Sequence, residues 1–178
     1  MRVVAGSMGG RRLATPGGDA TRPTSDLVRG AIFNSLSAQG VLEGAVVVDL
    51  FAGSGALGIE AVSRGATSVV FVERNRATAG VIKGNLAALG IGPQARVEVV
   101  DVLAWADRGG RGPVDLVLAD PPYSFDQWER LLAALVTFPT ALVVAESDRE
   151  IAAVGWDVRS VKRHGGTVVS QLSPRGAR

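Results

Sequence analysis

The sequence predicts an α/β protein with a doubly wound, mostly parallel sheet of seven strands that ends in an antiparallel hairpin, preceded by a short N-terminal arm and helix. Three observations lead to this fold class. Five short runs that are largely apolar are typical of parallel strands that are covered on both faces. These runs alternate with segments of helical periodicity. The last two strand-like segments are joined only by residues 164–166, which is too short a connection for a parallel pair.

The expected elements follow one another from residue 24 onwards. Thr24, Ser25 and Asp26 are candidate N-caps for a helix over 24–36. A second helix follows the first strand and ends at Arg64, and further helices are expected over 76–89 and 125–136. The expected strands lie at 45–50, 68–73, 96–100, 115–119 and 141–145, with hairpin strands at 156–163 and 167–172.

The composition excludes several classes of protein. At 178 residues the chain is sized for one hydrophobic core and a short appendage, and with 47% hydrophobic and 20% charged residues it is a folded chain. Without cysteine and with one histidine, it has neither a disulfide framework nor a thiolate metal site, so a metal-free, cytoplasmic protein is expected. No apolar run approaches the roughly 18 residues of a membrane span. No long apolar helix lies outside the fold, and a monomer is the simpler expectation.

A change of composition near residue 40 divides the chain into two regions. Residues 1–40 contain a short strand, a Gly-Gly turn, a Gly/Pro/Thr loop and the first helix, and residues 41–178 contain the alternating elements. The first region is basic and is a candidate for contact with nucleic-acid phosphate. A solvated face without a ligand is an equally good interpretation. The arginines concerned are Arg2, Arg11, Arg12 and Arg29, together with Arg22 in the loop.

The turn after the first expected strand is the first candidate site. Residues 49–58 contain the spacing G-x-G-x-x-G, and glycines there allow a tight turn and close approach of the backbone to a nucleotide-like ligand. With Glu73 about twenty residues on, the same pattern fits a nicotinamide-dependent oxidoreductase. Asp49 would repel a pyrophosphate but attract the cationic groups of S-adenosylmethionine. Glu73 can bind both ribose hydroxyls and Asp101 an adenine amine, although these acids are alternatively caps of the following helices.

The second candidate site is Asp120-Pro121-Pro122-Tyr123, directly after the fourth expected strand. Two consecutive prolines restrict the backbone and remove two N–H donors, so the aspartate and the carbonyl groups form a rigid set of acceptors. Such acceptors suit an exocyclic base amine, whose nitrogen becomes a better nucleophile when its hydrogens are accepted. Tyr123 would stack on a base that has been taken out of its helix. The alternative is a proline-rich turn without a ligand.

These motifs resemble those of a known family. Asp120-Pro121-Pro122-Tyr123 and Asp49-Leu50-Phe51-Ala52-Gly53-Ser54-Gly55 resemble the amino-methyltransferase pattern of class I enzymes with a Rossmann-like fold. The segments at 2–6, 10–13, 22–29 and 32–34 are similar to the RsmD family, bacterial 16S rRNA (guanine-N2-)-methyltransferases that act at position 966. The similarity covers essentially the whole chain. It implies an S-adenosylmethionine-binding domain over residues 41–178 and an RNA-binding arm with a lid helix over residues 1–40.

The resemblance also implies site residues. Asp120, Pro121, Pro122 and Tyr123 would be the catalytic residues that hold the guanine. The RNA-binding residues would be Arg2, Arg11, Arg12 and Arg29. No metal is expected, and the product of the cofactor would be S-adenosylhomocysteine. The cofactor-binding residues would be Arg22, Thr24, Asp49, Phe51, Ala52, Gly53, Gly55, Glu73, Arg74, Asp101, Val102 and Asp120.

One departure and several alternatives accompany this resemblance. Gly30 stands where the family has an acid, and it weakens the first helix by about 1 kcal/mol relative to alanine. The same chemistry would serve a DNA or RNA adenine-N6 methyltransferase, because nothing in the Asp-Pro-Pro-Tyr motif distinguishes the two amines. A short chain without a target-recognition insert favours rRNA within the small ribosomal subunit or an assembly intermediate. An inactive RNA-binding module is the other alternative from a different class.

Overall fold

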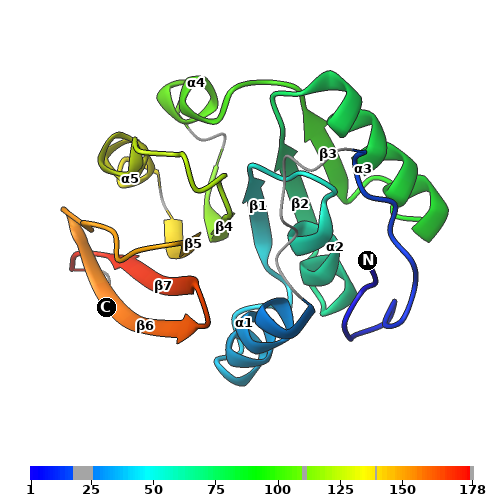
Figure 1. The fold of residues 1–178 in the computed structure, drawn as a ribbon, viewed down its shortest axis with the longest axis horizontal. Helices are drawn as coiled ribbons and strands as arrows, with labels where there is room; N and C mark the ends of the chain where they lie inside the picture. Colours follow the sequence, from blue (N-terminus) through cyan, green and yellow to red (C-terminus); the bar gives the residue numbers. More distant parts are fainter. Residues whose placement is uncertain (18–25, 110–111, 139, 177–178) are drawn as a thin grey trace.

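The computed structural model describes residues 1–17, 26–109, 112–138 and 140–176 of the chain (Figure 1). Its single sheet has the strand order β3-β2-β1-β4-β5-β7-β6, and β7 runs antiparallel to both of its neighbours. The predicted α/β class, the seven strands and the closing hairpin are therefore confirmed. The elements are α1 (Asp26–Ala38), β1 (Val46–Leu50), α2 (Ala56–Ser63), β2 (Ser68–Val72), α3 (Arg76–Leu89), β3 (Ala95–Glu98), α4 (Val102–Asp107), β4 (Val114–Ala119), α5 (Trp128–Leu135), β5 (Thr140–Ser147), β6 (Trp156–His164) and β7 (Thr167–Pro174).

The apolar runs of the strands supply two cores, one on each face of the sheet. Successive side chains of a strand point to opposite faces, so Val47 packs with α1, α2 and α3 while Val48 packs with α4 and α5. In β4 the same alternation places Leu118 on the first face and Ala119 on the second. A strand that is buried on both faces has no solvent-exposed side that would favour polar residues. This explains why β1 and β4 are largely apolar in sequence.

Local signals account for the bounds of α3, and they also explain why α4 was missed. The side chain of Asn75 accepts hydrogen bonds from the N–H groups of Ala77 and Thr78, and Gly90 ends the helix in a left-handed conformation. The expected range 76–89 is confirmed. The sequence did not predict α4, because a helix of six residues has too few positions to show a periodicity.

The N-terminal arm, residues 1–17, packs on the first face of the sheet and runs beside α2 and α3 (Figure 1). Val3 and Leu13 are buried in the same cluster as α1 and the strands, so packing is continuous across residue 40. The arm is folded back on itself through an isolated bridge between Arg2 and Arg12, where the sequence had suggested a short strand. Glu60 of α2 accepts hydrogen bonds from the backbone N–H groups of Val4 and Ala5.

No helix among the described residues has both the length and the apolar character needed to cross a membrane.

Candidate active site

The glycine loop between β1 and α2 is held in place by its neighbours. The N–H of Ala52 donates to the carbonyl of Val72 on β2, at 3.0 Å. The N–H of Gly53 donates to Glu73 Oε2, at 3.1 Å. Phe51 and Gly55 both have positive φ angles, of 59° and 80°, and such a turn is costly for most residues. The loop is therefore fixed in shape before any ligand arrives.

Asp49 supports this loop from within. Its side chain is 1% exposed, and its Oδ2 accepts a hydrogen bond of 2.8 Å from the N–H of Gly58 in the first turn of α2. Burial raises the pKa of Asp49 well above the ordinary value, the Gly58 N–H opposes this, and the nearby carboxylates of Asp120 and Glu73 raise the pKa further. Asp120 and Glu73 thus both lie close to Asp49, and the three acids stand at the carboxyl ends of β4, β2 and β1. This edge of the sheet is where ligands bind in folds of this type.

Three further predicted cofactor residues follow β2 and β3. Asp101 is exposed and caps α4, since its Oδ1 accepts from the N–H groups of Leu103 and Ala104. Asp101 therefore does cap the helix, and one oxygen of its carboxylate makes both capping hydrogen bonds. Val102 is buried in the second core, and Arg74 is exposed after β2.

The Asp-Pro-Pro-Tyr segment follows β4 and lies against the glycine loop. Phe125, three residues beyond Pro122, donates its N–H to the Pro122 carbonyl at 2.8 Å and so closes a turn. The rings of Phe51 and Phe125 meet edge to face with their centroids 5.0 Å apart. Tyr123 is 44% exposed, and its hydroxyl lies 3.2 Å from Thr167 Oγ1 on β7. The two motifs, 71 residues apart in the sequence at Asp49 and Asp120, thus lie side by side in the fold.

Asn85 of α3 joins the N-terminal arm to this site. Its amide Nδ2 donates to the carbonyls of Ala14 and Ser54, each at 2.9 Å, and its Oδ1 accepts from the Ala14 N–H at 2.8 Å. Asn85 was not among the residues predicted from the sequence. The available signal was a polar residue on the apolar stripe of a helix, beside Ile82 and Leu86. The side chain of Asn85 thus joins the arm to the glycine loop.

The four arginines predicted to contact RNA separate into two kinds. Arg2, Arg11 and Arg12 are exposed on the arm. Arg29 is 0% exposed, and it contacts Asp26 at 2.8 Å, the carbonyl of Arg2, and Glu60 of α2 at 3.9 Å. The prediction that Arg29 contacts RNA is therefore wrong, because no part of its guanidinium reaches the surface. Its position within a helix gave no sign of this burial.

Glu60 is the centre of the buried charges around Arg29. Its Oε1 accepts from Nε of Arg64 at 2.8 Å, and Glu60 itself is fully buried. A carboxylate between two arginines satisfies charges that would be costly to bury singly. The cluster joins α1, α2 and the arm, and it is structural. The predicted cofactor residues Arg22 and Thr24 lie outside the described residues.

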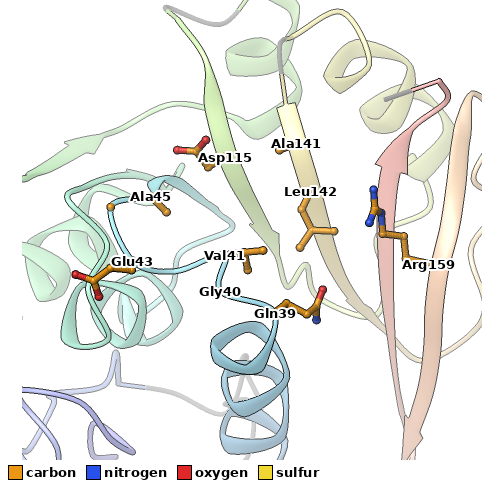
Figure 2. Close-up of a pocket in the computed structure, with 10 residues that line it drawn as sticks. Gln39, Gly40, Val41, Glu43, Ala45, Asp115, Ala141, Leu142 and Arg159 are labelled. Carbon is orange, nitrogen blue, oxygen red and sulfur yellow. The ribbon is translucent and has the colours of Figure 1, made fainter. Parts of the chain in front are cut away.

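A pocket of about 430 Å³ lies at the other edge of the sheet, among Ala45, Asp115 and Ala141 at the amino ends of β1, β4 and β5 (Figure 2). Asp115 Oδ2 accepts the N–H of Val46 there, at 2.8 Å. None of the residues predicted to bind cofactor or base lines this pocket. The candidate site therefore lies at the carboxyl ends of the strands and not in this pocket. Within the ranges given above, no group of three or more acidic or histidine side chains is placed to hold a metal ion.

The strand order and the position of the site at the carboxyl edge define the class I methyltransferase fold. Residues 1–172 match the family model described as Conserved hypothetical protein 95. The chain belongs to this family, that of the RsmD proteins.

Relatives and a solved structure agree with this assignment. The chain is 37% identical over 161 residues to "Putative rRNA methyltransferase YlbH" of Bacillus subtilis, covering 85% of this chain and 84% of the relative. It is 39% identical over 123 residues to "Ribosomal RNA small subunit methyltransferase D" of Escherichia coli, covering 69% of this chain and 60% of that relative. The solved structure "Putative methyltransferase yhhF" from Escherichia coli superimposes with a TM-score of 0.85 and 32% identity, over 98% of this chain and 97% of that one.

Proposed function

We propose that this protein transfers a methyl group from S-adenosylmethionine to the exocyclic N2 of a guanine in 16S rRNA of the small ribosomal subunit. The observation that carries the proposal is the contact between the glycine loop and the Asp-Pro-Pro-Tyr turn, through Phe51 and Phe125. A cofactor-type loop and a set of amine acceptors then share one site. The names of the rRNA methyltransferases to which the chain is similar support the substrate class.

The residues at the site fit S-adenosylmethionine in their chemistry. Asp49 and the two acids near it, Glu73 and Asp120, make a negative site that suits a cationic ligand and opposes a pyrophosphate. Glu73 already accepts hydrogen bonds from Gly53 and Asn75 N–H groups, and the remaining lone pairs of its oxygens suit ribose hydroxyls. When bound, the cofactor supplies a methyl group on a positively charged sulfur. S-adenosylhomocysteine, the product, has lost that charge, so the same acids favour its release.

The chain's own groups activate the base amine. Asp120 and the carbonyl of Pro121 accept the hydrogens of the exocyclic nitrogen, which localises its lone pair for attack on the methyl carbon. When the methyl group passes from the cofactor's sulfur to this nitrogen, Asp120 or solvent would take the proton that the amine loses. Activating this nitrogen does not require a strong base. The residues therefore act by positioning the amine and by their electrostatic effect. Tyr123, exposed and tied to Thr167, stacks on the base.

The exposed arginines of the arm complete the proposed RNA surface. Arg2, Arg11 and Arg12 lie on one folded-back segment, and Arg11 donates to the carbonyl of Ala88 near the end of α3. Through Asn85 this segment is fixed relative to the glycine loop. Phosphate contacts made by the arm therefore orient the substrate with respect to the methyl donor.

The test is transfer of labelled methyl to small subunits from cells that lack the endogenous enzyme, with the modified nucleoside identified by mass spectrometry. N2-methylguanosine in 16S rRNA is the expected product. Asp120→Asn should bind S-adenosylmethionine within a few-fold of the wild type and lose transfer. N6-methyladenosine would instead establish the adenine alternative, and cofactor binding without transfer to any base would refute the proposal.

A further inference from the structure

Tyr123 is the one aromatic side chain that stays exposed in the part of the chain that the structure describes. It is 44% exposed, whereas the phenylalanines and tryptophans are buried or half-buried. A ring inside a core is held in place by its neighbours, but an exposed side chain changes its rotamer rapidly unless something else fixes it. The orientation in which Tyr123 stacks on a base therefore needs another source.

The backbone end of this side chain is fixed by the turn in which it lies. Pro121 and Pro122 each restrict φ to about −65°. The N–H of Phe125 donates to the carbonyl of Pro122 at 2.8 Å, and Nη2 of Arg149, which follows β5, donates to the carbonyl of Phe125 at 3.2 Å. The side chain of Tyr123 thus starts from a constrained backbone.

The other end of the side chain, its hydroxyl, meets β7. Oη of Tyr123 lies 3.2 Å from Oγ1 of Thr167, the first residue of that strand. In the strand order β7 is separated from β4 by β5, so the turn after β4 reaches past the carboxyl end of β5 to make this contact. Neighbouring strands lie about 4.8 Å apart, so the hydrogen bond joins strands that are about 10 Å apart.

Thr167 is itself held firmly by the sheet. It pairs with His164 in the hairpin, and the next residue, Val168, is 1% exposed and pairs with Ser147 of β5 and Arg163 of β6. A β-branched side chain has few accessible rotamers, so the hydroxyl of Thr167 has a nearly fixed position. This hydroxyl can donate or accept a hydrogen bond, and so can the phenol that it meets.

We propose that Thr167 is a positioning residue: its hydroxyl holds the ring of Tyr123 in the orientation in which the target base stacks on it. This inference rests on the proposed function and deepens it. A ring that is oriented before the base arrives loses less freedom on binding, so the base binds more tightly. Stacking is made before and during methyl transfer alike, so its weakening should raise KM and leave kcat nearly unchanged.

The first measurement is made on the protein alone. The chain contains a single tyrosine, so isotope-labelled tyrosine gives NMR ring signals from Tyr123 only. Thr167→Val keeps the shape of the side chain and removes the hydroxyl, and it should lower the order parameter of the ring. Thr167→Ser keeps the hydroxyl and should keep the ordered ring. An equally ordered ring in the wild type and in Thr167→Val would overturn the proposal.

The second measurement is methyl transfer to small subunits that lack the modification. Thr167→Val should raise the KM for the subunits about 2- to 10-fold, the range of one neutral hydrogen bond, and Thr167→Ser should stay near the wild-type KM. Tyr123→Phe removes the other hydroxyl and should have the same effect. The double variant should be no worse than either single variant, because both remove one and the same hydrogen bond. Additive effects would mean that the two hydroxyls act separately, against the proposal.

Thr67→Val is the matched control. Thr67 is exposed immediately before β2, at the amino edge of the sheet, and its hydroxyl donates to the carbonyl of Gly44 at 2.8 Å. This variant should keep the wild-type KM, and both valine variants should bind S-adenosylmethionine as the wild type does.

The outcomes separate this inference from the proposed function. An unchanged KM in Thr167→Val overturns the role of Thr167 and leaves the methyltransferase assignment in place. A wild type that methylates no base of the small subunit refutes the proposed function and, with it, this role.

Discussion

Gly58 offers a sharp test of how tightly the glycine loop and its helix are packed. A Cβ at this position would lie 2.3 Å from Cε1 and 2.8 Å from Cζ of Phe71, and 2.9 Å from Cγ1 of Val69. Both neighbours are buried on β2 and have no room to move aside. Gly58 is thus the residue that lets α2 approach the sheet, and its N–H is the donor that Asp49 accepts.

The expected effect of Gly58→Ala follows from two opposing contributions. Overpacking a close-packed core costs about 2–3 kcal/mol, and alanine's better helix propensity returns about 1 kcal/mol. The free energy of unfolding should therefore fall by about 1–2 kcal/mol. Gly84→Ala is the matched control, because Gly84 lies within α3 and its added Cβ meets nothing within 4 Å. That variant should gain about 1 kcal/mol.

Urea unfolding followed by tryptophan fluorescence measures both variants, since Trp128 and Trp156 are buried. S-adenosylmethionine binding should weaken in Gly58→Ala and remain unchanged in Gly84→Ala. A Gly58→Ala protein as stable as the Gly84→Ala protein would contradict the close approach of α2 to β2.

Three further variants test other parts of the structure. Asp49→Asn keeps a hydrogen-bond acceptor and removes the charge. Because the pKa of Asp49 is raised in the folded state, the stability of the wild type should fall as the pH rises from the ordinary aspartate range through that raised pKa. The stability of the variant should fall less, which unfolding measured across this pH range would show. Glu60→Gln should lower the free energy of unfolding by about 3 kcal/mol, because two buried arginines lose their carboxylate. Urea unfolding measures this, with Glu129→Gln as the control. Nearly equal free energies of unfolding in the two variants would argue against the cluster around Glu60. Arg12→Ala should lower the slope of log K for RNA binding against log salt concentration by about 1, the effect of one phosphate contact. A slope identical to that of the wild type would remove Arg12 from the proposed RNA surface.

The sequence by itself determined the elements of the sheet and the two motifs of the site. The apolar runs at 45–50 and 115–119 can be buried only in a sheet that is covered on both faces. The short connection at 164–166 allows only an antiparallel pairing of the strands that it joins. The glycine loop and the Asp-Pro-Pro-Tyr turn follow strands whose carboxyl ends share one edge. These features depend on neighbours within a few residues, which a sequence displays directly.

Only the tertiary structure decided which polar side chains are structural and which face the site. Arg29 looked like a surface arginine, but Glu60, 31 residues away in the sequence, holds it in the core. Asn85 meets Ala14, 71 residues away, and so connects the arm to the glycine loop. Such partners are set by strand register and helix docking, which follow from the summed burial of many apolar residues and leave no local pattern at the polar residues themselves.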